Sequence, residues 1–129
     1  MEAVSILAAS VAGFATGAVW YMALSKPWIA ASGVRVGADG RPMGGAAPFV
    51  VSFVVMLVVS GFMRHVFAGA GIATPGAGLV AGLGCGAFLI APWIAMGNAY
   101  AGRPAALSVI DGGYAVLGCG AIGLVLTLV

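Results

Sequence analysis

Four long apolar segments constrain the fold of this chain more than any other feature. They cover about residues 3–24, 48–67, 76–100 and 106–129. A helix needs about 20 mainly apolar residues to cross a bilayer, and each segment is long enough. The segments are continuously apolar instead of alternating in polarity, which favours helices over a β-barrel. The sequence therefore predicts an all-α fold, an integral membrane four-helix bundle that forms a single transmembrane domain over residues 1–129.

The composition excludes several classes of protein. Only 6% of the 129 residues are charged and 63% are hydrophobic, whereas a soluble domain has about 25% charged residues. The few basic residues form no patch that would suit a nucleic acid. The first apolar segment follows Glu2, where a secretion signal carries Lys or Arg, so we expect a retained helix in contact with the lipid bilayer.

The connection between the first two spans, residues 25–47, is expected to be a long loop. Trp28 suggests that its first part rests at the level of the lipid headgroups, as a short interfacial helix, and GADGRP is typical of a turn. The basic residues of the first and third loops lie on one side, with only Arg64 opposite. That bias predicts that these two loops lie in the cytoplasm and both termini outside, and we expect the membrane to be a bacterial inner (plasma) membrane. The four loop residues are Lys26, Arg35, Arg41 and Arg103.

Glycines recur at helical spacing and predict close helix packing. Residues four apart share one face of a helix, and small residues let helix backbones approach closely in lipid. Two interpretations stay open: tight packing inside one bundle, or a seam between copies in a homo-oligomer. The glycines concerned are Gly13, Gly17, Gly78, Gly82, Gly86 and Gly118.

Asp111 lies about one turn inside the fourth span, where a carboxylate is costly unless it faces protein or water. Most other polar and aromatic residues of the spans fall at the same membrane side. We therefore predict a polar cluster at the cytoplasmic end. Its candidate members are Trp20, Tyr21, Lys26, Trp28, Asn98, Arg103, Asp111 and Tyr114.

Three roles are open for this cluster. Asp111 pairs with Lys26 or Arg103, or caps a helix end, and so holds the hairpins together. Alternatively the cluster lines a pocket for a lipid or small hydrophobic ligand, or Asp111 binds a proton, cation or substrate during transport. Trp20 and Tyr21 are adjacent, so we expect one to face the cluster and the other to face lipid.

Other features indicate no catalytic or metal site. Cys85 and Cys119 lie at similar predicted depth but lack the spacing of metal ligands. Pro92 removes a backbone donor within the third span and predicts a kink. His65 is expected to be an interfacial residue. No Ser-His-Asp arrangement, phosphate loop or pair of catalytic carboxylates is present, so we expect neither enzyme activity nor a cofactor.

Two stretches carry a family resemblance. GAVWYMALSKPWIAASG, residues 17–33, contains Gly-x-x-Trp-Tyr and then Lys-Pro-Trp, and GRPAALSVIDGGY, residues 102–114, contains Gly-Arg-Pro and Ile-Asp-x-x-Tyr. In order and spacing they resemble a bacterial and fungal membrane-protein family catalogued as domain of unknown function 1761. The resemblance implies four membrane helices and no assigned activity. Leu24 and Ser25 stand where the family pattern has an aromatic-glycine step. The family pattern carries over to Gly17, Trp20, Tyr21, Pro27, Trp28, Arg103, Pro104, Asp111 and Tyr114.

These observations predict a non-enzymatic multi-pass membrane protein. We expect it to act as a homo-oligomer or as an accessory subunit bound to another membrane protein. The alternative is a small transporter or channel that uses Asp111, and the third possibility is a protein that binds a lipid or small hydrophobic ligand.

Overall fold

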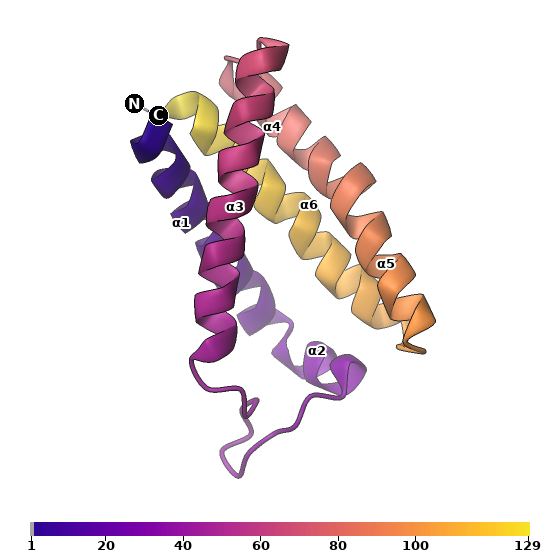
Figure 1. Ribbon diagram of the computed structural model, residues 1–129. Helices are drawn as coiled ribbons and strands as arrows, with labels where there is room; N and C mark the ends of the chain where they lie inside the picture. The colour runs from indigo at the N-terminus through magenta and orange to yellow at the C-terminus, as the bar shows by residue number, and fades with distance from the viewer. Residues whose placement is uncertain (1) are drawn as a thin grey trace.

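The computed structural model describes residues 2–129, and the regular structure in this range is helical apart from one isolated bridge between Val36 and Pro42 (Figure 1). Four helical segments in this range are long and apolar enough to cross a membrane: Glu2–Ala23, Ala47–Ala70, Pro75–Tyr100 and Ala105–Leu128. The predicted all-α class and the four candidate spans are thereby confirmed. The helices are α1 (Glu2–Ala23), α2 (Ser25–Ser32), α3 (Ala47–Ala70), α4 (Pro75–Cys85), the π-helical turn η1 (Gly86–Ile90), α5 (Ala91–Tyr100) and α6 (Ala105–Leu128).

The long loop expected between the first two spans is not confirmed as such, because its first eight residues form α2. The break from α1 is local: Leu24 has φ −109° and ψ 21°, yet its N–H still bonds the Trp20 carbonyl. Pro27 fits the first turn of α2, where a missing N–H leaves no helical bond unmade. Gly33 ends the helix in the left-handed region at φ 68°, and the connection from there to α3 is residues 33–46.

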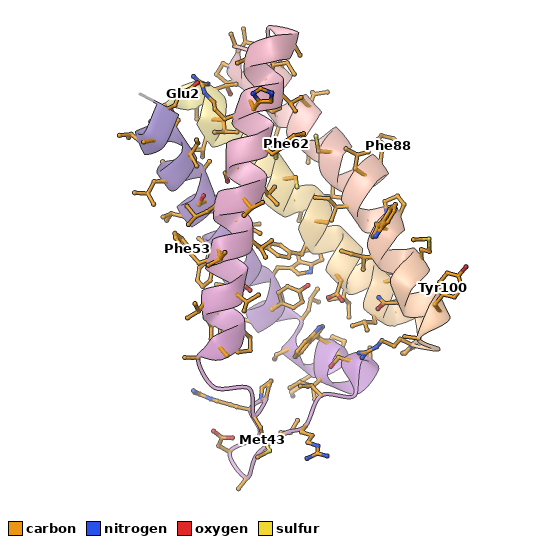
Figure 2. All side chains as sticks on the ribbon, viewed as in Figure 1. Glu2, Met43, Phe53, Phe62, Phe88 and Tyr100 are labelled. Carbon is orange, nitrogen blue, oxygen red and sulfur yellow. The ribbon has the colours of Figure 1, made fainter. Side chains whose placement is uncertain are left out.

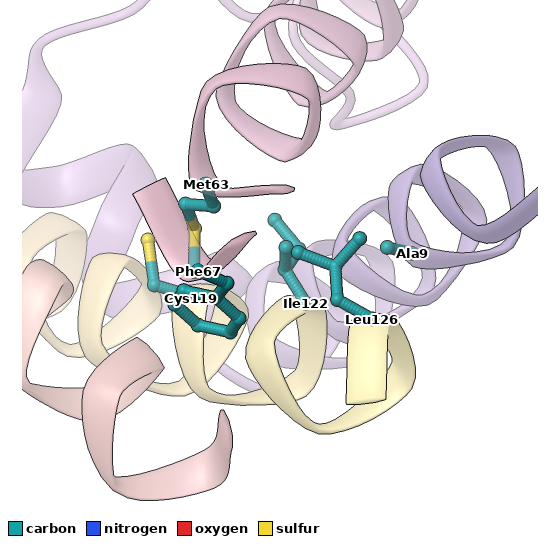
Figure 3. Packing of buried hydrophobic residues seen from close by; sticks show 6 residues of the cluster. All are labelled: Ala9, Met63, Phe67, Cys119, Ile122 and Leu126. Atoms are coloured by element: carbon teal, nitrogen blue, oxygen red, sulfur yellow. The ribbon is translucent and has the colours of Figure 1, made fainter. Parts of the chain in front are cut away.

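Helix α6 is the centre of the molecule. It packs against α1 on one side and against α4, η1 and α5 on the other, while α3 packs mainly on α1 and crosses in front in Figure 1. Half of the most apolar part of α6 is buried, against 11% for α3. The buried apolar cluster lies where α1, α3 and α6 meet (Figure 3), near the end that carries both termini (Figure 1). It consists of Ala9, Met63, Phe67, Cys119, Ile122 and Leu126.

The third span stays helical through Pro92 by means of a π turn. The N–H of Ala91 bonds the carbonyl of Gly86, five residues back. Pro92 has no N–H and crowds the carbonyl of Phe88, so the wider turn lies directly before the residue that disturbs the α-helical bonding. The sequence predicted a kink at this point, and the structural feature found there is η1, Gly86–Ile90.

The contact of α4 and η1 with α6 is made backbone to backbone through glycines. A Cβ atom at Gly78, Gly82 or Gly86 would overlap the carbonyl oxygens of Gly123, Cys119 and Ala115, respectively. The order of the partners runs backwards along α6, so the two helices are antiparallel and in step every four residues. This stripe lies inside the protomer, and so it is not a surface seam between copies.

Candidate functional site

Asp111 is joined to Tyr21 across the contact between α1 and α6. The Tyr21 hydroxyl donates a hydrogen bond of 2.7 Å to Asp111 Oδ1. Both side chains are half-buried. Hydrogen bonds between helices are among the interactions that hold helices together in lipid. The carboxylate therefore fixes the end of α1 against α6.

Trp20 makes a second bond between the same helices. Its indole Nε1 donates to the carbonyl oxygen of Ile110 at 2.8 Å. Its ring lies over Gly113, where a Cβ atom would come within 2.6 Å of the indole Cζ2. The expectation that only one of Trp20 and Tyr21 faces the cluster is wrong. Adjacent helical residues differ in direction by about 100°, so the two side chains lie on either side of the line of contact and both reach α6.

Tyr114 completes the contact from the α6 side. Its hydroxyl donates to the Gly13 carbonyl at 2.9 Å and lies 3.4 Å from the Sδ atom of Met56 in α3. Its ring lies where a side chain at Gly17 would otherwise be, because a Cβ there would be 2.7 Å from Tyr114 Cζ. The Tyr21 ring meets Tyr114 edge to face with centroids 5.5 Å apart. The Tyr114 side chain of α6 thus contacts both α1 and α3.

The cluster continues into α2 through aromatic contact. Trp28 packs edge to face with Tyr21, with ring centroids 5.9 Å apart. The guanidinium of Arg103 donates to the carbonyl of Ser32 at 3.2 Å, at the last residue of α2. The short helix is therefore attached to α1 near its middle and to the connection between α5 and α6 at its end.

The remaining predicted members do not bond Asp111. Asn98 Nδ2 donates to Ser108 Oγ at 3.1 Å and links α5 to α6, while Lys26 is exposed. Over residues 2–129 the one ion pair joins Arg64 to Glu2. The hypothesis that Asp111 pairs with Lys26 or Arg103 is therefore wrong. Helical spacing placed these residues at one membrane end but could not give their direction around the helix axis.

The cluster offers a single carboxylate, bonded by one donor, the Tyr21 hydroxyl, and not a metal-binding set. Among residues 2–129 no three His, Cys, Asp or Glu side chains gather at one point. Cys85 and Cys119 are free thiols. Chemically, the arrangement can hold helices together through Asp111, or bind a proton or cation on the carboxylate.

A model of the family described as "Protein of unknown function (DUF1761)" matches residues 4–127. The chain belongs to this family. No curated protein and no solved structure matches the chain. The resemblance noted in the two motif stretches is thereby confirmed over nearly the whole sequence.

Several partners of the motif residues in this DUF1761 protein were not predicted. Trp20 and Tyr114 bond the backbone carbonyls of Ile110 and Gly13, and side-chain patterns carry no signal for a backbone acceptor. The glycine pattern of the fourth span includes Gly113, but it gave no indication that the ring of Trp20 packs on this residue.

Proposed function

We propose that this protein is a non-enzymatic multi-pass membrane protein that acts by assembly, as a homo-oligomer or as an accessory subunit of a membrane complex. One observation carries the proposal: the motif residues direct their polar groups at other atoms of the same chain. Tyr21 bonds Asp111, Trp20 bonds the Ile110 carbonyl, and Tyr114 bonds the Gly13 carbonyl. These residues are best explained as a joint that sets the angle of α1 and α2 on α6.

The surface available for assembly is apolar and includes several exposed aromatic side chains. On η1 and α5, Phe88, Trp93 and Tyr100 are 81%, 73% and 90% exposed, and on α3 Phe49 and Phe62 are 64% and 67% exposed. Phe88 and Tyr100 point away from the other helices (Figure 2). Aromatic residues dominate the binding energy of many interfaces. Since the glycine stripe of α4 is used within the protomer, we assign partner contact to these aromatic faces.

The proposed setting is a bacterial inner membrane with both termini outside. The Lys and Arg residues of the two connections at the α2 end outnumber those at the other end, where Arg64 stands alone. Basic residues in short connections favour the cytoplasmic side. The Asp111 joint would then lie near the cytoplasmic face.

A small transporter or channel is the second candidate. It is favoured by Asp111, a half-buried carboxylate inside a candidate span that has no basic partner among residues 2–129. Acids in such positions are often ion or proton sites. In that case Asp111→Asn would abolish flux in proteoliposomes while leaving the melting temperature unchanged, and assembly would not depend on the aromatic faces.

Lipid or small-ligand binding at the joint is the third candidate. An apolar groove of about 450 Å³ runs beside Trp20 between α1 and α6. Its lining residues include Thr16, Val19 and Leu117. A ligand there would leave Tyr21 and Asp111 bonded to one another, so its binding would respond to Trp20→Ala and not to Asp111→Asn.

The test is native mass spectrometry of the protein gently extracted from its own membrane. We expect a defined oligomer, or a stoichiometric complex with another chain, and we expect Trp93→Ala to weaken it. Val109→Ala is the matched control, because Val109 is also 73% exposed but lies on α6. A wild-type protein that is monomeric and without a partner chain would overturn the proposal.

A further inference from the structure

The end of the molecule opposite the Asp111 cluster contains a cavity of about 330 Å³. It lies between the C-terminal parts of α3 and α6 and the turn that follows α3. Its walls include Phe67, Ala68, Ile72 and Leu126, together with the guanidinium-bearing Arg64. A volume near 300 Å³ is the lower limit for typical ligand pockets, so there is room for a small head group and the start of a chain.

Arg64 lines this cavity with most of its hydrogen-bonding capacity unused. A guanidinium has five N–H donors. Nη1 makes one long hydrogen bond, 3.4 Å, to the Leu126 carbonyl. Nε lies 3.8 Å from Glu2 Oε1, which is also a long contact. Nε is buried and makes no hydrogen bond within the described chain. Glu2 is a weak counter-ion, since its side chain is 71% exposed.

The chemistry of the cavity selects an anionic amphiphile. The Arg64 side chain is 30% exposed, and a guanidinium with unused donors favours phosphate or carboxylate oxygens, which it binds through two parallel hydrogen bonds. The other walls, Phe67, Ile72 and Leu126, are apolar and suit a hydrocarbon chain. Arg64 lies six residues before the end of α3, or about 9 Å along the helix, and is therefore close to one end of a candidate span.

We propose that this cavity is a binding site for an anionic phospholipid, with the lipid phosphate on Arg64 and an acyl chain along Phe67 and Ile72. The site is independent of the Asp111 joint and of the proposed assembly. The proposal also gives a role to Arg64, which is the one Lys or Arg residue at this end of the helices.

The experiment is a titration of the delipidated protein in neutral detergent with phosphatidylglycerol or phosphatidylcholine, read by native mass spectrometry and by the melting temperature. We expect stoichiometric retention of phosphatidylglycerol and a rise in melting temperature that phosphatidylcholine does not give. Arg64→Gln should lower the affinity for phosphatidylglycerol by about tenfold or more, the usual effect of losing a charge-assisted hydrogen bond. Arg103→Gln, which removes a cation at the other end, is the matched control and should leave the affinity unchanged.

Three further arms separate a lipid site from a purely structural arginine. Ala68→Leu fills the cavity wall and keeps the charge, and it should also release the lipid. Glu2→Gln removes the competing acid and should tighten lipid binding. Inorganic phosphate alone should neither raise the melting temperature nor displace the lipid. Equal retention of phosphatidylglycerol by Arg64→Gln and wild type would overturn the proposal, as would equal loss in Arg103→Gln or full competition by inorganic phosphate.

Discussion

Helix α6 packs against its neighbours through different interactions on its two sides. Against α4 and η1, glycines bring backbone onto backbone, and few side chains, chiefly Thr127 and Leu83, take part in the closest contacts. Against α1, large side chains fill the space and three hydrogen bonds cross it, from Trp20, Tyr21 and Tyr114. The contact with α4 and η1 depends on the absence of side-chain atoms at the glycines. The contact with α1 depends on the presence of particular polar atoms.

The difference shows how a chain with few polar residues can specify one arrangement in lipid. Apolar burial gives little drive between helices there, so association relies on van der Waals contact and interhelical hydrogen bonds. The glycines of α4 and η1 allow close van der Waals contact with α6, but such contact does not favour one orientation of the helices. The hydrogen bonds between α1 and α6 fix the orientation of the two helices, because each donor has a single acceptor on the facing helix. The comparison predicts that the two sides respond differently to substitution.

The largest effect is expected at Gly82. Gly82→Ala places a methyl group on the Cys119 carbonyl, and backbone cannot move aside, so the free energy of unfolding should fall by roughly 1–3 kcal/mol. Gly84→Ala is the matched control, because nothing lies within 4 Å of a Cβ at that position. Chemical unfolding in mixed micelles measures both. An equal loss in the two variants would contradict backbone contact at Gly82.

A smaller loss is expected at Gly17 on the aromatic side. Gly17→Ala would place Cβ 2.7 Å from Tyr114 Cζ, and a side chain can turn away at a cost of roughly 0.5–1.5 kcal/mol. The same unfolding assay measures the loss. Tyr114→Leu should relieve the clash, so the double variant should be no less stable than Tyr114→Leu alone. A loss at Gly17 as large as that at Gly82 would break the comparison.

Trp20 tests the directional bonds alone. Trp20→Phe keeps an aromatic ring but loses the bond to the Ile110 carbonyl, and interhelical hydrogen bonds in membranes average about 0.6 kcal/mol. We expect a loss of that size in the free energy of unfolding. Trp93→Phe, at a position that is 73% exposed, should leave the stability of the monomer unchanged. Equal effects would show that the indole bond does not matter.

The smallest effect is expected at Arg103. Its side chain bonds the Ser32 carbonyl at an exposed site, so Arg103→Gln should change global stability by only a few tenths of a kcal/mol. The local consequence is release of the end of α2. Limited proteolysis within residues 33–46 should accelerate several-fold, and Lys26→Gln is the control. Unchanged proteolysis would mean that Trp28 alone holds α2.

The sequence was sufficient for the helical class and the four candidate spans, because membrane thickness sets the length of an apolar run. It was also sufficient for the family, since two motif stretches keep their order and spacing. It did not give α2 with certainty, because Ser25–Ser32 is too short for periodicity to separate a helix from a loop.

The partners of Asp111 could not be read from the sequence for a different reason. Spacing along helices gives depth in the membrane, and it placed Lys26 and Arg103 near Asp111 in depth. Direction around each helix axis depends on packing, which brings Tyr21 to the carboxylate instead. Likewise the spacing of Gly78, Gly82 and Gly86 fits an internal contact and an oligomer seam equally well, and only their carbonyl neighbours on α6 distinguish the two.

The most direct test of the account is a double-mutant cycle between Tyr21 and Asp111 in the free energy of unfolding. Tyr21→Phe and Asp111→Ala, alone and combined, isolate the bond between the two side chains. We predict a coupling free energy of about 0.6–1.7 kcal/mol, the range for interhelical hydrogen bonds in membranes. Additive effects, with a coupling below about 0.3 kcal/mol, would contradict the role of Asp111 as the joint between α1 and α6.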